Sequence, residues 1–214
     1  MRERLFGALL GMAATALVFA ALHYQFGWLA AGGVLAFIGW MVGGYIRHLH
    51  RVAERDALTG ICNRRPFERI LVREWNRSVR YGRPVSLLFI DVDDFGSVNK
   101  QFGHLMGDET LKVLARLLRH SVRNIDVVAR WGGEEFVILL PETEVSAALV
   151  LAERIRRVVE QTVVRDGDRA VSVTISTGVA GYPGTARHVR ELLRQAMLAE
   201  AEAKHRKNAV SIVS

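Results

Sequence analysis

The sequence has only one cysteine, Cys62, in 214 residues. A single cysteine excludes an intramolecular disulfide, and it also excludes a metal site built from several thiolates. Stability must therefore come from a hydrophobic core, and a chain of this length with 50% hydrophobic residues can form one. This cysteine usage is typical of proteins in a reducing compartment.

Charge is absent from one long stretch of the chain. Between Leu5 and Ile46 there is no Asp, Glu, Lys or Arg. The segment His23–Gly27 divides this stretch into two spans, about 5–22 and 26–46, and each has about the 20 residues that a helix needs to cross a bilayer. The sequence therefore predicts a hairpin of two transmembrane helices.

Basic residues flank both ends of the uncharged stretch. Arg2 and Arg4 precede it, Arg47 and Arg51 follow it, and the loop between the spans has no Lys or Arg. By the positive-inside rule, both ends face the cytoplasm, which predicts a multi-pass membrane protein. A secretory signal peptide is the alternative for the first span, although its apolar core is usually shorter, about 7–15 residues.

The net charge of +7 is scattered along the chain and forms no basic block. This distribution does not indicate a nucleic-acid partner, and part of the excess sets the membrane topology. Residues 47–55 are polar and contain no Gly or Pro, which predicts a short linker helix. Residues 56–214 then have the composition and size of one globular domain, without internal repeats.

Apolar periodicity in the globular part predicts alternating helices and strands. Helices are expected at about 63–81, 108–119, 144–164 and 185–204, and strands at 85–92, 126–131, 134–141, 171–182 and 209–213. Gly132 and Gly133 separate two strand-like runs, as in a β-hairpin. These elements predict an α/β (α+β) fold in which flanking helices cover one mixed sheet.

Acidic residues stand where two of the predicted strands meet a turn. Asp91 lies near the end of an apolar strand, and Glu134 and Glu135 follow the two glycines of the hairpin. If these strands are neighbours, the carboxylates converge at one edge of the sheet and attract a cation. Hard oxygen ligands with room for water and phosphate favour Mg²⁺. Considered singly, each acidic segment also fits a solvated turn.

A third polar segment runs from Asn99 to Leu111. Asn99 offers an amide donor and acceptor, His104 lies between two glycines, and Asp108 can accept two N–H bonds side by side. Guanine presents an adjacent N1–H and 2-amino group, so it is the purine that such a carboxylate recognises. The structural alternative makes Asp108 a helix cap and places His104 in a turn.

The segment GGEEF, Gly132–Phe136, resembles the signature of the GGDEF family of diguanylate cyclases. Four segments resemble the blocks of this family in its order: DALTGICNRRPFERIL, DVDDFGSVNKQFGHLMGDETL, RNIDVVARWGGEEFVILLP and VSVTISTGVA. The resemblance covers about residues 56–214. It implies a palm-like fold related to class III nucleotidyl cyclases, and a homodimer that condenses two GTP molecules to cyclic di-GMP and two pyrophosphates. Together with the predicted spans, this predicts a location in the bacterial inner (cytoplasmic) membrane.

The resemblance also implies a role for individual residues. Asp91, the carbonyl of Val92 and Glu134 would hold Mg²⁺ or Mn²⁺, while Glu134 and Glu135 would assist deprotonation of the 3′-hydroxyl. Five residues would contact the substrate GTP: Asn99, His104, Asp108, Lys204 and Lys207. Arg123 and Asp126 resemble the family's RxxD inhibitory site, where the product cyclic di-GMP would bind.

Three features depart from the family pattern, and one of them is Lys100, which follows Asn99 where the family usually has Asp. Gly96 stands where the family usually has a lysine that stabilises phosphate charge. Near the C-terminus one residue is missing, so Lys207 takes the place of an arginine, and lysine lacks the planar fork of arginine. Two hypotheses follow: a working diguanylate cyclase, and a catalytically weak GGDEF domain that signals by binding cyclic di-GMP or GTP.

Overall fold

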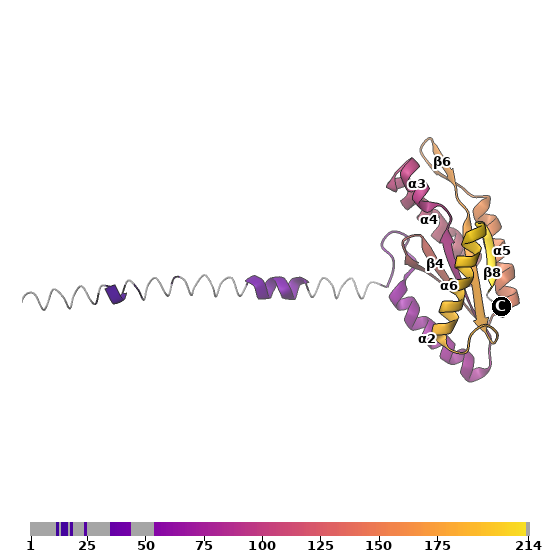
Figure 1. The fold of residues 1–214 in the computed structure, drawn as a ribbon, viewed down its shortest axis with the longest axis horizontal. Helices are drawn as coiled ribbons and strands as arrows, with labels where there is room; N and C mark the ends of the chain where they lie inside the picture. The colour runs from indigo at the N-terminus through magenta and orange to yellow at the C-terminus, as the bar shows by residue number, and fades with distance from the viewer. Residues whose placement is uncertain are drawn as a thin grey trace, which may run out of the picture. The chain divides into compact units, whose positions relative to one another are not determined.

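The computed structural model describes residues 12, 14–16, 18, 24, 35–43 and 54–212. The chain divides into two compact units, Met1–Val52 and Ala53–Ser214 (Figure 1). In the N-terminal unit, the described residues are helical. Within the described part of the chain, no helix has both the length and the apolar character needed to span a bilayer. The predicted spans, 5–22 and 26–46, lie largely outside the described residues.

Most of the predicted linker helix, 47–55, also lies outside the described residues. Its last two residues are described and are not helical, because the chain folds back on itself here. Arg55 forms an isolated antiparallel bridge with Cys62, and its guanidinium donates to the Gly60 carbonyl at 2.8 Å. The loop is closed by the Asp56 amide, which donates to the Ile61 carbonyl at 2.8 Å.

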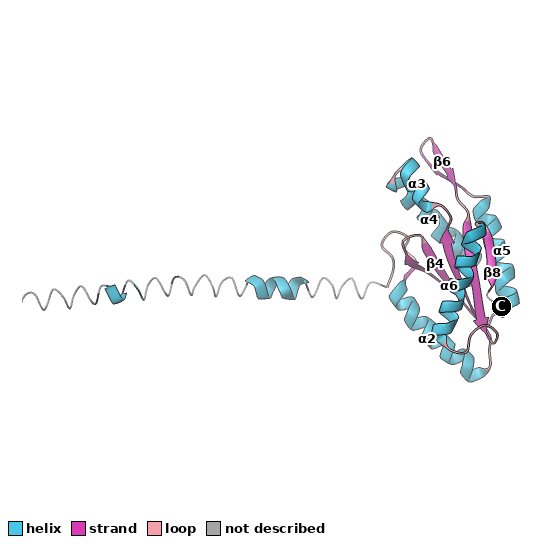
Figure 2. Cartoon of the chain, viewed as in Figure 1, coloured by secondary structure: helices cyan, strands magenta, loops and turns pink. Residues whose placement is uncertain are grey.

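The C-terminal unit is built on a six-stranded mixed sheet with the order β1-β3-β4-β2-β7-β8 (Figure 2). Central β2 pairs antiparallel with both β4 and β7, while the two edge pairs are parallel. The sequence prediction of a mixed sheet is confirmed. The strands are β1 (Cys62–Asn63), β2 (Val85–Val92), β3 (Val127–Gly132), β4 (Glu135–Pro141), β7 (Ile175–Tyr182) and β8 (Ala209–Ile212).

Helices cover both faces of this sheet. Helices α2 (Arg64–Tyr81) and α6 (Val189–Arg206) pack on one face, and α4 (His104–Ser121) and α5 (Val145–Glu160) pack on the other. Because side chains alternate along a strand, Leu87 and Phe89 of β2 enter the first core while Leu88 and Ile90 enter the second. Both faces of β2 are therefore buried.

Helix α6 approaches the sheet very closely at Gly178 of β7. A Cβ at this position would lie 2.0 Å from the Ala196 carbonyl oxygen and 2.2 Å from the Glu200 amide nitrogen. Glycine is the one residue without a Cβ, so it allows the two backbones to meet. The C-terminal half of α6, which carries Glu200 and Lys204, is consequently held against the sheet, as Figure 2 shows for the whole helix.

Four of the described elements were not predicted from the sequence, and the first of them is the short edge strand β1. A short helix, α3 (Phe95–Phe102), precedes α4, and a hairpin of β5 (Val163–Asp166) and β6 (Arg169–Ser172) follows α5. The hairpin occupies the region where the long helix was expected to end and the strand at 171–182 to begin. Its turn contains Gly167 at φ 57°, directly after Asp166. The two turn residues are Gly167 and Asp168, and Gly-Asp between two strands is a tight-turn signal, so the sequence did contain evidence for this hairpin.

Candidate functional site

The predicted carboxylates come together at one end of the central strands. Asp91 of β2 lies directly opposite Glu135 in the antiparallel register of β2 and β4. Opposite residues in such a pair have side chains on the same face of the sheet. Glu134 precedes Glu135 in the β3–β4 turn. Asp91 is buried and both glutamates are half-buried, so three acidic groups share a poorly solvated region.

The conformation of the β3–β4 turn depends on Gly133 and on Arg130. Gly133 has φ 52°, and a Cβ placed on it would meet no atom within 4 Å. Arg130 donates from Nε to the Gly133 carbonyl at 2.9 Å, and its Nη1 lies 3.1 Å from Asp56 Oδ1. Burial acts to raise the pKa of Asp56, but hydrogen bonds from Thr59 and Arg130 lower it overall. The Asp56–Arg130 pair, which the sequence analysis missed, ties the turn to the loop before β1.

Burial is the largest influence on the pKa values of Asp91 and Glu135 in the acidic group. Burial raises the pKa of Asp91, and the charges of Glu134 and Asp93 raise it further against the lowering effect of Lys204. Burial also raises the pKa of Glu135, with Asp91 and Glu134 adding to the effect. Clustered carboxylates of this kind are stabilised when a cation binds among them.

Lys204 of α6 supplies a positive charge to this group. Its Nζ lies 2.7 Å from Asp91 Oδ1. Burial acts to lower the pKa of Lys204, but the adjacent Asp91, together with Glu200 and Glu134, raises it overall. The ammonium is therefore charged at neutral pH and lies beside the carboxylate that was predicted to bind a metal.

Glu200 joins the same region and was not predicted from the sequence. It lies one helical turn before Lys204, and burial raises its pKa to about 7, with the charge of Asp91 adding and that of Lys204 opposing. Its Oε1 is buried and accepts no hydrogen bond from the described residues. The i, i+4 spacing of Glu200 and Lys204 was the available sequence signal, since such residues share a helix face.

Asp93, two residues after Asp91, has a structural role. Asp93 is buried, and its carboxylate accepts hydrogen bonds from Ser176 Oγ and Thr174 Oγ1, both at 2.7 Å. It also accepts one from the Asn208 amide at 2.8 Å. These bonds tie the end of β2 to the chain around β7 and to the segment before β8.

Lys207, a predicted substrate contact, lies against a different acid. Its Nζ is 2.7 Å from both carboxylate oxygens of Asp94, and both side chains are more than half exposed. Asp94 begins α3 with a left-handed backbone, φ 53°. The structure therefore places Lys207 at the start of α3, where the next helical residues are Phe95 and Gly96.

Gly96 lies in the first turn of α3 and is exposed. A Cβ at this position would meet no heavy atom within 4 Å, and its φ is not in the left-handed region. The backbone thus has room for the side chain that the family usually carries here.

The predicted guanine contacts lie where α3 packs on α4. Asn99 Oδ1 lies so close to Gly107 that a Cβ there would be 2.0 Å from it. This contact places the Asn99 amide next to the backbone that leads into Asp108. Asn99 and Asp108 are half-buried, whereas His104, the first residue of α4, is exposed. The structure thus places Asn99 beside Gly107, the residue that precedes Asp108.

Arg123 and Asp126 form a separate site in the turn before β3. The Arg123 amide donates to Asp126 Oδ2 at 2.8 Å, and burial raises the pKa of Asp126 against the opposing effect of that bond. A cavity of about 390 Å³ opens beside both residues and is also lined by Arg154 of α5. Arg154 was missed, because no local spacing in the sequence relates it to the RxxD turn.

The oxygen donors at the acidic site fit a small divalent cation. Among the residues that the structure describes, no three Asp, Glu, His or Cys side chains form a ready-made metal cluster. The expected set requires only the carboxylates of Asp91 and Glu134 and the carbonyl of Val92. All three are hard oxygen donors, and the repulsion that raises the pKa of Asp91 is of the kind that a cation relieves.

Comparison with known proteins gives consistent matches. The family model described as "Diguanylate cyclase, GGDEF domain" matches residues 53–209. The response regulator PleD of Caulobacter vibrioides is 42% identical over 151 residues, which cover 70% of this chain and 33% of PleD. The chain therefore aligns with about a third of the length of that relative.

Two solved structures resemble the C-terminal unit. The active GGEEF domain of a diguanylate cyclase from Vibrio cholerae is 31% identical, with a TM-score of 0.67, and the match covers 72% of this chain and 98% of that one. The GGDEF domain of DgcB from Caulobacter crescentus, in complex with c-di-GMP, is 27% identical, with a TM-score of 0.70, and the match covers 74% of this chain and 92% of that one. The residues that the family model matches, 53–209, include Asp91, Glu134 and Glu135.

Proposed function

Because the chain belongs to the GGDEF family of diguanylate cyclases, we propose that it condenses two GTP molecules to cyclic di-GMP and two pyrophosphates. The observation that carries this proposal is the convergence of Asp91, Glu134 and Glu135 at one end of the sheet, beside Lys204. The family's palm-like α/β fold, with its mixed sheet and flanking helices, supports it.

The acidic residues would hold the divalent metal that this family generally uses, which we assign as Mg²⁺, with Mn²⁺ as a substitute. Asp91, Glu134 and the Val92 carbonyl are its proposed ligands. When bound, the metal supplies positive charge that neutralises the triphosphate and lowers the pKa of the attacking hydroxyl. Glu135, whose pKa burial and Asp91 raise, is suited to accept the hydroxyl proton.

The remaining residues of the site would bind the nucleotide. Asp108 and Asn99, which lie at the α3–α4 junction, would accept and donate hydrogen bonds to guanine, and His104 stands at the same helix end. Lys204, beside Asp91, and Lys207, beside Asp94, carry ammonium groups that would contact phosphate oxygens.

Two chains would be needed for one turnover. We propose that each domain holds one GTP and that the 3′-oxygen of each nucleotide attacks the α-phosphorus of the other. A homodimer with the two acidic sites facing each other is therefore part of the proposed catalytic unit. Holding both nucleotides in place replaces a slow encounter between them with a reaction inside the complex.

The RxxD turn would supply feedback inhibition by the product. A cyclic di-GMP phosphate could pair with the exposed Arg123 guanidinium, and guanine N–H groups could donate to Asp126. Arg154, which lines the same cavity of about 390 Å³, adds a second guanidinium. The DgcB domain of similar fold was solved with c-di-GMP, which supports binding of this ligand in the family.

Membrane anchoring remains a proposal that rests on the sequence. The uncharged stretch 5–46 and its basic flanks favour two spans in the bacterial inner membrane, with the catalytic domain in the cytoplasm. Such an anchor would favour dimerisation by confining two copies to one plane. Removal of residues 1–46 is then expected to lower activity at low protein concentration and to restore it at high concentration.

The second candidate function is that of a catalytically weak GGDEF domain that signals by binding cyclic di-GMP or GTP. It is favoured by Gly96, which lacks the family's lysine, and by the pairing of Lys207 with Asp94. The two functions are separated by incubating the purified full chain with GTP and Mg²⁺ and separating the products by chromatography, beside a Glu134→Gln, Glu135→Gln variant. The proposed function predicts cyclic di-GMP from the wild type and none from the variant. A dimeric, GTP-bound wild type that forms no product would refute it.

A further inference from the structure

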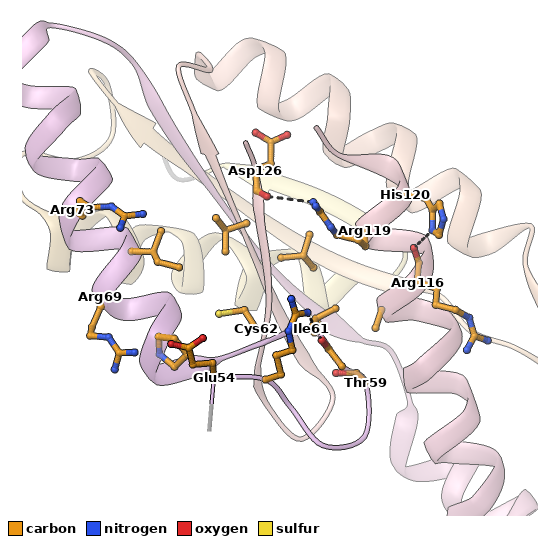
Figure 3. Close-up of a pocket in the computed structure, with 17 residues that line it drawn as sticks. Glu54, Thr59, Ile61, Cys62, Arg69, Arg73, Arg116, Arg119, His120 and Asp126 are labelled. Atoms are coloured by element: carbon orange, nitrogen blue, oxygen red, sulfur yellow. Dashed lines mark hydrogen bonds between the residues drawn. The ribbon is translucent and has the colours of Figure 1, made fainter. Parts of the chain in front are cut away.

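A cavity of about 720 Å³ lies beside the β1–β3 edge of the sheet (Figure 3). Its walls come from the loop before β1, from α2, from α4 and from the start of β3. None of the residues assigned above to metal, guanine or triphosphate lines it. Its volume falls within the range of about 300–1,000 Å³ that is usual for small-molecule sites.

The walls of this cavity are strongly basic. Five of its lining residues are arginines, none is a lysine, and His120 adds a further nitrogen base. The two acids that line it are Glu54 and Asp126, and the Asp126 carboxylate points away from Arg119 in Figure 3. The arginines are Arg55, Arg69, Arg73, Arg116 and Arg119.

Fold stability does not account for the arginines that α2 contributes. Arg69 and Arg73 are one helical turn apart, and like charges at this spacing destabilise a helix. Among residues 54–212, Arg69 has no hydrogen-bond or ion-pair partner. Arg73 reaches Glu74 at 3.4 Å, with 71% of its side chain exposed. Both guanidinium groups are therefore available to an external anion.

The floor between the basic walls is apolar. Ile61, Ile70 and Val128 line it together with parts of the helices. A ligand that matches this cavity combines an anionic group with an apolar body. Arginine favours phosphate, because its planar fork donates two parallel hydrogen bonds to one phosphate group.

We propose that this cavity binds a phosphate ester, with its phosphate held by Arg69 and Arg73 of α2 and its apolar body resting on the floor. Free nucleotides and phospholipid headgroups share this chemistry. The site is separate from the acidic site. It shares Asp126 with the cavity that Arg123 and Arg154 line, but no other lining residue is common to the two.

Arg119 connects this cavity to the RxxD turn. Its Nη1 lies 3.3 Å from the Arg123 carbonyl and 3.5 Å from the Asp126 carbonyl, while its side chain lines the cavity (Figure 3). A bound phosphate competes for this guanidinium and loosens its hold on the turn. Occupancy of the cavity therefore changes the affinity of the turn for its own ligand, and the coupling is reciprocal. This second consequence rests on the proposed function of the turn.

The direct test is calorimetric titration of the full chain in detergent with EDTA. The probes are ADP, which lacks the guanine donors that Asp108 would recognise, and a soluble short-chain phosphatidylglycerol. An Arg69→Ala, Arg73→Ala variant is compared with an Arg65→Ala, Arg80→Ala variant, which removes the same charge from exposed positions of α2 outside the cavity. We expect one probe to bind, with at least tenfold weaker affinity in the first variant and less than twofold change in the second.

The outcomes of the titrations show whether the ligand is a free nucleotide or a lipid headgroup, and whether the cavity binds phosphate at all. Binding of ADP identifies free nucleotides, and binding of the lipid alone identifies a headgroup. Lack of binding by both probes, or equal weakening in both variants, would overturn the proposal. A second cavity variant, Arg69→Gln, Arg73→Gln, must behave as the alanine variant does. The cyclic di-GMP affinity, measured with and without the bound probe, tests the coupling; if cyclic di-GMP fails to bind at all, the proposed function of the turn fails while the phosphate site stands.

Discussion

The Lys204 ammonium lies 2.7 Å from Asp91 Oδ1 and joins the C-terminal half of α6 to the end of central strand β2. Asp91 is 5% exposed, so its charge needs a nearby cation, and Lys204 provides one. A divalent metal bound by Asp91 would take over this neutralisation. The ammonium would then be available to the phosphates of GTP.

Replacement of Lys204 should separate substrate binding from metal binding. In Lys204→Gln, we expect KM for GTP to rise by about 10-fold or more, because a charge-assisted hydrogen bond to phosphate is lost. The affinity for Mn²⁺ without nucleotide should increase, because the competing ammonium has gone. Steady-state kinetics and a Mn²⁺ titration measure the two effects. An unchanged KM would show that Lys204 does not contact the substrate.

The raised pKa of Glu200 predicts a pH-dependent stability. Below about pH 4.5 its carboxyl is protonated in both the folded and the unfolded chain, so it costs nothing. As the pH rises from about 4.5 to about 7, the carboxyl loses its proton in the unfolded chain but still holds it in the folded chain, so the free energy of unfolding falls across this range. Glu200→Gln removes this loss and should therefore stabilise the protein more at pH 8 than at pH 5. Urea denaturation in EDTA measures this, and an equal effect at both pH values would contradict the burial of the charge.

Gly96 offers a gain-of-function test. Since the structure leaves open space at this position, Gly96→Lys should fit without displacing its neighbours. We expect the rate of cyclic di-GMP formation to rise about 10-fold, because one cation is restored near the transferred phosphates. Gly96→Gln is the control for length and helix propensity. The same gain with glutamine would show that charge is not the cause.

Gly178 sets the distance between α6 and the sheet. Gly178→Ala places a Cβ within 2.2 Å of two backbone atoms of α6, so the helix must move. We expect destabilisation of about 1–3 kcal/mol or more, together with lost activity, because Glu200 and Lys204 move with the helix. Gly96→Ala, at an open helical position, should instead stabilise by about 0.5–1 kcal/mol. Comparing the thermal stability of the two variants distinguishes a steric clash at Gly178 from a general effect of replacing glycine by alanine.

Much of the fold could be predicted because local patterns and tertiary structure agree. The buried strand at 85–92 and the Gly132–Gly133 hairpin appear where apolar runs and turn residues indicated them. The hairpin then positions Glu135 opposite Asp91, and so the acidic group followed from two short segments. The family resemblance is confirmed by the match to residues 53–209.

The missed features depend on contacts between distant segments. Asp56 and Arg130 are 74 residues apart, and Arg154 reaches the RxxD cavity from another helix. The periodicity of apolar residues indicates local helices and strands, so it cannot predict contacts between residues this far apart in the sequence. Glu200 was missed for a different reason: its spacing from Lys204 was visible, but its burial arises from the close contact of α6 with Gly178. Close approach of backbones is set by the whole fold.

The most direct test of the central claim is the rate of cyclic di-GMP formation by Asp91→Asn, measured by chromatography with saturating GTP and Mg²⁺. The matched control is Asp168→Asn, which makes the same chemical change at an exposed position in the β5–β6 turn. The account predicts that the Asp91 variant loses about 10²–10³ in rate, because the metal that would neutralise the triphosphate loses a carboxylate ligand, while the control stays within a factor of two of wild type. A rate near wild type for Asp91→Asn, with the dimer intact, would contradict it.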